Sequence, residues 1–198
     1  ELKNNSSNAV TNQWQTIEIS TAGVVDWSTE TFGDAKLHEA DLNQDLDGDG
    51  KIWSQNSEVL TAVSSDTKGA LAYLDSSKNL FIASGAGQTK QAVLDFSGGL
   101  ISFDETYSLG NFTDKREVLA VEAATVGGTD YYKVLIKNTT SSGSDTTTAY
   151  ETVNIKQSTM IVDWGTFSYY VDPKKLESAF QIDIDGDGTI TTISSSST

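Results

Sequence analysis

The chain has 198 residues, of which 37% are hydrophobic and 21% are charged, and its formal net charge at pH 7 is −15. This composition supplies enough apolar material for a folded core, and the acidic excess excludes nucleic acid and anionic lipid as natural partners, because both need Lys or Arg to neutralise phosphate. The absence of cysteine excludes disulfides and thiolate metal sites, and no apolar run approaches the length of a membrane span. We therefore expect a folded protein that attracts divalent cations and does not insert into membranes.

The first element that the sequence predicts is a short helix over residues 34–43, which leads directly into an acidic loop at 45–50. Strands follow, because apolar residues alternate or run together over strand lengths. The predicted strands are 70–75, 79–84, 117–123, 131–137 and 149–155. Turn-forming segments separate them, and the polar stretch 138–147 is expected to form a long hairpin tip.

A second helix is expected to begin at Asp172 and Pro173, where the aspartate can cap the helix and proline suits the first helical position. Leu176 and Phe180 continue it at helical spacing, and it also leads into an acidic loop, at 183–188. The predicted fold class is therefore mainly β with short helices, a β-rich module that ends in a short helix and an acidic loop.

A long-period repeat organises these elements. The segment VVDW, which ends at Trp27, matches IVDW, which ends at Trp164, and the two acidic loops match at a separation of about 138 residues. We interpret the chain as the trailing part of one module, one complete module with the same ending, and a Ser/Thr-rich tail. These segments are residues 1–52, 53–190 and 191–198, and the whole resembles a piece of a longer polypeptide.

The acidic loops carry the chemistry of the chain. The pattern DxDxDG is the front half of a twelve-residue, EF-hand-like calcium loop, in which positions 1, 3 and 5 supply carboxylates, glycine at position 6 permits a sharp turn, and position 7 supplies a backbone carbonyl. The predicted ligands are Asp45, Asp47, Asp49 and the Lys51 carbonyl in loop one, and Asp183, Asp185, Asp187 and the Thr189 carbonyl in loop two.

Both loops depart from the full calcium motif at position 12, which is normally a bidentate glutamate. This position is Asn56 in loop one and Ser194 in loop two, although Glu58 lies two residues further on. Loss of a bidentate carboxylate weakens binding, so we expect a Kd of about 10⁻⁴ to 10⁻³ M, which is typical of extracellular calcium modules. The alternative is that each loop is an acidic turn without an ion.

The matched tryptophans allow two interpretations. Trp27 and Trp164 follow a matched aspartate in each copy, and exposed aromatic rings can stack on sugars. Recurring tryptophan in a β-rich module is more often part of the core, so we predict core positions. The aspartates that precede the tryptophans, Asp26 and Asp163, are predicted to be either metal ligands or turn caps.

No catalytic constellation is evident, and we predict that the chain is not an enzyme. His38 is the single histidine, and its counterpart in the second copy is Leu176, so we interpret it as a substitution on a helix surface. The chain has no GxSxG segment and no phosphate-binding glycine loop. Carboxylate pairs for glycosidase chemistry are not excluded in so acidic a chain, but no pair stands out.

The chain resembles the tryptophan-rich C-terminal domain of cyanobacterial and proteobacterial exoproteins. The resemblance rests on LAVEAATVGGTDYYKVLIKN at 119–138, on the two VDW segments, on LESAFQIDIDGDGTI at 176–190 and on DLDGDGKI in the first copy. It covers 53–190 fully and 14–52 as a trailing part. That family occurs in tandem in large secreted proteins, often beside haemolysin-type (RTX) calcium repeats, although the GGxGxDxUx nonapeptides of such repeats are absent here. The resemblance implies an extracellular or cell-surface location and a structural or adhesive role.

These observations together predict a calcium-binding structural or adhesive module, in which Ca²⁺ stiffens the junctions between modules. The expected partners are calcium, neighbouring modules of the same chain and, for adhesion, surface glycans or another cell-surface protein. The alternative is a carbohydrate-binding module or a non-catalytic segment of a secreted glycan hydrolase.

Overall fold

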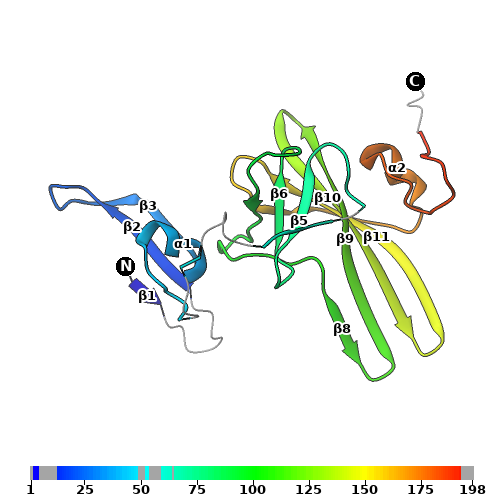
Figure 1. Ribbon diagram of the computed structural model, residues 1–198, viewed down its shortest axis with the longest axis horizontal. Helices are drawn as coiled ribbons and strands as arrows, with labels where there is room; N and C mark the ends of the chain where they lie inside the picture. The colour runs from blue at the N-terminus through cyan, green and yellow to red at the C-terminus, as the bar shows by residue number, and fades with distance from the viewer. Residues whose placement is uncertain (1, 5–12, 49–51, 54–58, 64, 193–198) are drawn as a thin grey trace. The chain divides into compact units, whose positions relative to one another are not determined.

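The computed structural model describes residues 2–4, 13–48, 52–53, 59–63 and 65–192 (Figure 1). The chain divides into two compact units, residues 1–58 with 94–100, and residues 59–93 with 101–198. Both consist of antiparallel sheets with short helices, so the predicted fold class is confirmed. The module boundaries at 52 and 190 rest on similarity between the two copies and stay a prediction.

The first unit contains a three-stranded antiparallel sheet in the order β1-β2-β3, followed by one helix. The elements are β1 (Leu2–Asn4), β2 (Gln13–Ile19), β3 (Val25–Asp34) and α1 (Ala35–Leu42). Gly23, with φ of 77°, supports the turn between β2 and β3, where the Ser20 amide donates to the Val24 carbonyl. The predicted first helix is confirmed, and the Asp34 side chain caps it by accepting from the Lys36 amide.

The second unit is built on a five-stranded antiparallel sheet in the order β12-β11-β10-β9-β8. Its strands are β8 (Thr106–Leu109), β9 (Phe112–Val126), β10 (Thr129–Ser142), β11 (Asp145–Lys156) and β12 (Val162–Tyr170). The β9–β10 turn uses Gly127 and Gly128, both at positive φ, which matches the twist of a two-residue hairpin.

The predicted long hairpin tip at 138–147 is wrong. Strands β10 and β11 continue through this polar stretch, and only Gly143 and Ser144 remain between them. Thr139 pairs with Thr148 and Thr140 with Thr147, and the β-branched threonines suit extended, paired strands even where they are polar.

A four-stranded sheet in the order β4-β5-β6-β7 packs against one face of the larger sheet. Its strands are β4 (Thr61–Ala62), β5 (Leu71–Leu74), β6 (Leu80–Ala83) and β7 (Gln91–Ala92). Leu80 and Ile82 meet Val134, Ile136 and Val153 in the main core. Figure 1 shows the β8–β9 and β10–β11 hairpins running on beyond this small sheet, so part of the same face is left uncovered.

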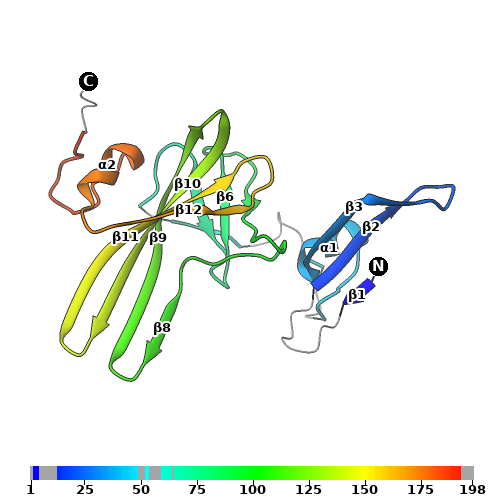
Figure 2. The same cartoon turned by 180° about the vertical axis from the view of Figure 1, so that it is seen from behind.

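Helix α2 (Lys174–Phe180) packs on the opposite face of the five-stranded sheet, as the reverse view shows (Figure 2). Leu176 and Phe180 contact Ala120, Leu135 and Tyr150 in a second, smaller core. The middle parts of strands β10 and β11 are therefore buried on both faces, and in β11 all residues from Ala149 to Ile155 are buried.

The sequence repeat is also a structural repeat. Strands β2 and β3 with α1 correspond to β11 and β12 with α2, and each hairpin carries a register shift at the same place. In the first copy the shift lies between Thr16 and Glu18, and in the second between Thr152 and Asn154. Asp26 and Asp163 accept backbone amides from two residues further on in each copy, so these aspartates are turn caps.

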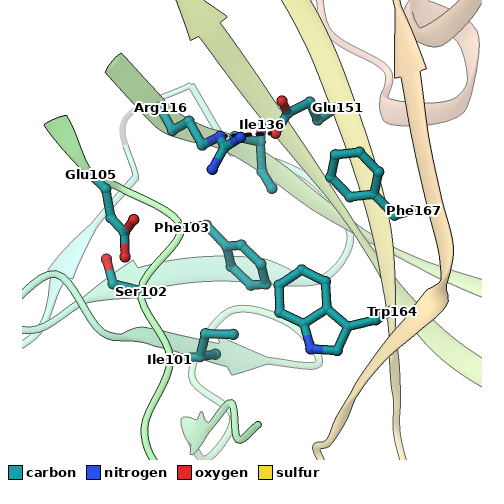
Figure 3. A pocket seen from close by; sticks show the side chains of 9 residues that line it. All are labelled: Ile101, Ser102, Phe103, Glu105, Arg116, Ile136, Glu151, Trp164 and Phe167. Carbon is teal, nitrogen blue, oxygen red and sulfur yellow. Dashed lines mark ion pairs between the residues drawn. The ribbon is translucent and has the colours of Figure 1, made fainter. Parts of the chain in front are cut away.

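The prediction that the matched tryptophans are core residues is wrong. Trp27 is 67% exposed and Trp164 is 46% exposed. Each lies in an edge strand of its sheet, next to the register shift. Trp164 stands beside the buried Phe103 at the margin of the main core, as Figure 3 shows.

Candidate metal centre

Each acidic loop is positioned by the way the preceding helix ends. Asn43 after α1 and Gln181 after α2 adopt the left-handed conformation, with φ of 51° and 53°. This conformation stops the helix and reverses the chain, so the loop runs back alongside the helix that precedes it. The same chain reversal in both copies brings loop residues next to a side chain from the middle of the helix.

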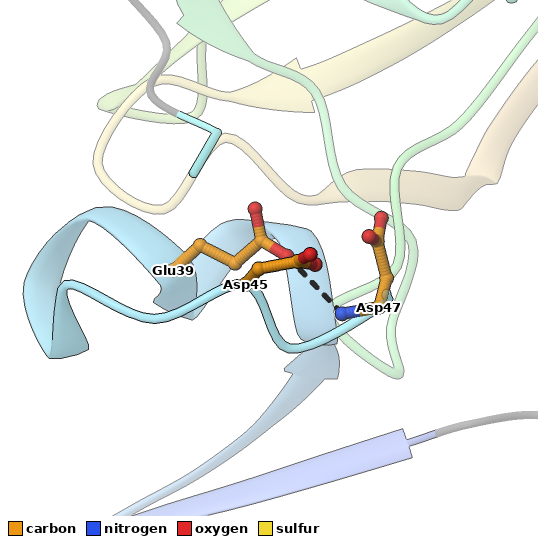
Figure 4. Close-up of side chains that lie close together, drawn as sticks. All are labelled: Glu39, Asp45 and Asp47. Atoms are coloured by element: carbon orange, nitrogen blue, oxygen red, sulfur yellow. Dashed lines mark hydrogen bonds between the residues drawn. The ribbon is translucent and has the colours of Figure 1, made fainter. Parts of the chain in front are cut away.

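That helical side chain is a glutamate, and sequence reasoning missed it. Glu39 in α1 is 1% exposed. Its Oε1 accepts the backbone amides of Leu46 and Asp47 at 2.9 and 3.2 Å, and its Oε2 accepts the Trp53 amide at 2.6 Å. Figure 4 shows the carboxylate reaching from the helix to the loop. One buried side chain therefore holds both the start and the end of loop one.

Glu177 repeats this arrangement in loop two and is fully buried. Its Oε1 accepts the amides of Ile184 and Asp185 at 3.2 and 3.4 Å, and its Oε2 accepts the Thr191 amide at 2.9 Å. The bond from the Thr191 amide is the largest of the effects that hold the pKa of Glu177 below its ordinary value. A signal was present in the sequence, since a glutamate stands at the same distance before the first loop aspartate in both copies.

The loops gather three carboxylates at each site. One oxygen each from Glu39, Asp45 and Asp47 lie within 4.8 Å of one another, and the same holds for Glu177, Asp183 and Asp185. Thus four of the predicted ligands are brought together, two in each copy. Asp49 and Lys51, like Asn56, Glu58 and Ser194, lie outside the described residues.

The first aspartate of each loop also organises the turn. Asp45 Oδ1 accepts the Gly48 amide at 2.7 Å, and Asp183 Oδ1 accepts the Gly186 amide at 2.8 Å. Asp183 Oδ2 further accepts the Gly188 amide at 2.7 Å. Three glycines of the loops have φ near +80°, a backbone conformation that residues other than glycine rarely adopt: Gly48, Gly186 and Gly188. The spacing of aspartate and glycine therefore serves the turn as well as the charge.

Two of the predicted ligands in loop two have other partners. Asp187 lies 2.8 Å from the Lys174 ammonium, which is also 3.4 Å from Asp185 Oδ2. The bond from Lys174, followed by those from the Thr189 hydroxyl and amide, lowers the pKa of Asp187 to about 2. The hydrogen bond between Lys174 and Asp187 also raises the pKa of the Lys174 ammonium above its ordinary value. A cation, here an ammonium, already lies against the carboxylates of loop two.

The donor set fits a hard divalent cation. Three carboxylates supply only oxygen ligands, and Ca²⁺ takes six to eight oxygens, so backbone carbonyls and water would complete the shell. The amide bonds to the glutamates use part of their acceptor capacity and orient them, which leaves lone pairs for an ion. Like charges so close together are stable only if a cation or hydrogen-bond donors offset them.

The interpretation of His38 as a helix-surface residue is wrong. His38 is half-buried, and its Nε2 is buried without a hydrogen-bond partner among the described residues. Its counterpart Leu176 is 3% exposed and belongs to the second core. His38 therefore occupies the face of α1 that corresponds to the packed face of α2, and it lies outside the acidic cluster.

Comparisons with protein-family models, with curated proteins and with solved structures find no match. The resemblance to tryptophan-rich exoprotein domains accordingly stays a prediction. No helix in the described parts of the chain is both long and apolar enough to cross a membrane.

Proposed function

We propose that the two loops bind divalent cations, with calcium as the natural ion, and that the chain is a calcium-stiffened structural or adhesive module of a secreted or cell-surface protein. The observation that carries the proposal is that one cluster, a buried helical glutamate with two loop aspartates, is built twice from matching residues. A single acidic turn is common, whereas a repeated turn closed by a buried carboxylate on the same helix position favours a binding role.

Calcium is favoured over other metals by the ligand chemistry. The described clusters contain carboxylates only, and soft or borderline metals prefer imidazole or thiolate ligands. Magnesium demands a small octahedral shell, whereas a flexible loop with many carbonyls suits the larger ion. The structural role is supported by the position of the ion, which would join a helix to the loop that follows it in a chain without disulfides.

Calorimetric titration with Ca²⁺ and Mg²⁺ tests the proposal. We expect two Ca²⁺ sites per chain, each weaker than micromolar, and a melting temperature that rises with Ca²⁺ and falls with EGTA. At a free concentration about 100-fold above Kd, each site adds about 2.7 kcal/mol to the free energy of unfolding. Asp47→Ala and Asp185→Ala should each remove one site and leave the other.

Asp163→Asn is the matched control, because it removes one acidic charge from a turn cap outside both clusters and should preserve both sites. Absence of binding heat together with an unchanged melting temperature would refute the metal proposal. Loss of both sites in one single variant would instead show that the loops form one shared site.

A further inference from the structure

A pocket of about 360 Å³ lies on the face of the five-stranded sheet opposite α2, beside the main core. Strands β9 to β12 form its floor, and the segment 101–105 forms one wall (Figure 3). Its volume falls within the range of small-ligand sites. All of its residues belong to the second unit, and none is part of the acidic clusters.

One side of the pocket is aromatic. Trp164 and Phe167, both from β12, are 46% and 44% exposed. The buried Phe103 packs behind the indole of Trp164 with ring centroids 5.8 Å apart and an interplanar angle of 59°. This contact holds the indole in place while nearly half of its surface stays open to solvent. Exposed, fixed aromatic rings provide an apolar platform for a ligand.

The other side of the pocket is polar, and its side chains are fixed by an ion pair and by hydrogen bonds. Arg116 Nε lies 3.2 Å from Oε2 of Glu151, whose side chain is 5% exposed and whose Oε1 accepts from Asn138 Nδ2 at 3.1 Å. Arg116 Nε is buried, and although Glu151 Oε2 lies within ion-pair distance, the two atoms do not form a hydrogen bond, so the Nε–H is left for another acceptor. Glu105 is placed beside Arg116 by two backbone hydrogen bonds, of 2.7 and 3.1 Å.

We propose that this pocket binds the sugar rings of a neutral oligosaccharide. The ring of a hexopyranose has an apolar face of C–H groups and a perimeter of hydroxyls that both donate and accept. The apolar face matches Trp164 and Phe167, the Arg116 guanidinium donates to hydroxyls, and the carboxylates of Glu105 and Glu151 accept from them. Arg116 and Glu151 offset each other, so Glu105 leaves the pocket slightly negative, which disfavours an anionic ligand.

The same face continues beyond the pocket with one further exposed aromatic ring. Tyr169 is the direct cross-strand partner of Glu151, so its side chain projects from the same face, and it is 61% exposed. A row of rings along one face fits successive sugars of a chain better than a single monosaccharide. The site is independent of the acidic loops, since loop two and α2 lie on the other face of the sheet.

The test uses the whole chain, with Ca²⁺ present, and neutral cello-, xylo-, malto-, laminari- and chito-oligosaccharides, first on an array and then by calorimetry. We expect binding to at least one of these series. Trp164→Ala and Phe167→Ala should each weaken it roughly tenfold or more, which corresponds to about 1.4 kcal/mol. Both rings are substantially exposed, so the variants should keep the wild-type circular dichroism spectrum.

Trp27→Ala is the matched control, because it removes the counterpart tryptophan of the first copy, which lies outside the pocket, and it should leave affinity unchanged. Asp185→Ala should also retain sugar binding, which separates this site from the metal proposal. The proposal is overturned if no neutral oligosaccharide binds, if only sulfated or uronic-acid chains bind, or if binding survives both aromatic substitutions in folded protein.

Discussion

At the scale of single residues, Lys174 is the side chain that already occupies loop two. Its ammonium lies against Asp185 and Asp187 in loop two. An incoming divalent cation must therefore displace a bound ammonium from loop two.

We predict that Lys174→Gln strengthens Ca²⁺ binding at loop two, by about three- to tenfold, because it removes both a competing cation and a source of repulsion. The affinity should be measured by calorimetry in an Asp47→Ala background, in which loop one is expected not to bind Ca²⁺. Lys175→Gln in the same Asp47→Ala background is the control, because Lys175 is the exposed neighbour of Lys174 in α2, and it should change affinity less. Weaker binding in Lys174→Gln would mean that the lysine holds the carboxylates in place for the ion.

At the scale of secondary-structure elements, Asp66 connects the two sheets of the second unit. It lies in the connection between β4 and β5 and is 8% exposed. Its Oδ2 accepts the Ala72 amide at 2.6 Å and the Val121 amide of β9 at 3.2 Å. Burial raises the pKa of Asp66 to about 7, although both amide bonds act in the opposite direction.

This raised pKa predicts that the free energy of unfolding falls as pH rises from about 4 to about 7. The folded state keeps a proton on Asp66 that the unfolded chain releases near its ordinary pKa of 3.8, so neutral pH favours unfolding. The full shift corresponds to roughly 4 kcal/mol. Urea unfolding at pH 5 and pH 8 in EGTA measures the effect, and Asp66→Asn should reduce the difference.

Asp95→Asn provides the control, because Asp95 also accepts backbone amides in a turn, from Ser97 and Gly99, but does not link two sheets. It should leave the pH dependence as in the wild type. An equal pH dependence in Asp66→Asn and the wild type would show that Asp66 is ionised in the folded state throughout this range.

At the scale of the whole molecule, loop one comes shortly before residue 59, where the second compact unit begins. Glu39 holds the Trp53 amide, and Trp53 is 6% exposed, so the chain that leaves loop one is tied to α1. If Glu39, Asp45 and Asp47 bind one ion together, the ion restricts backbone torsions in loop one. Fewer torsions then stay free in the chain that leads to the second unit. Without the ion, repulsion between the carboxylates loosens the segment.

Small-angle scattering should therefore show a broader distribution of conformations and an altered maximum dimension when EGTA replaces Ca²⁺. Asp47→Ala should reproduce the effect of EGTA, because it removes a ligand from the loop ahead of the second unit. Asp185→Ala, in the loop at the far end of that unit, should leave the scattering curve nearly unchanged. Identical curves under all these conditions would mean that calcium is a local staple and does not stiffen the junction.

The sequence by itself predicted the local parts of the molecule. Helical spacing and capping residues located both helices, DxDxDG located the two turns, and alternation located the strands around Ala72, Ile82, Val121, Val134 and Val153. These features depend on neighbours a few positions away, so the spacing of residue types is enough to predict them. The repeat was also visible in sequence, because one supersecondary unit is encoded twice.

Only the tertiary structure decided which side chains meet. Glu39 and Glu177 look like ordinary helical glutamates, and their role depends on a chain reversal that brings the loop back over the helix. The exposure of Trp27 and Trp164 depends on their place in the last strand of each sheet, and the β10–β11 hairpin is long because its threonines find partners across the strands. Burial, pairing and ion contacts are set by residues far apart in the chain, and the spacing of residue types carries no information on which distant segments will pack together.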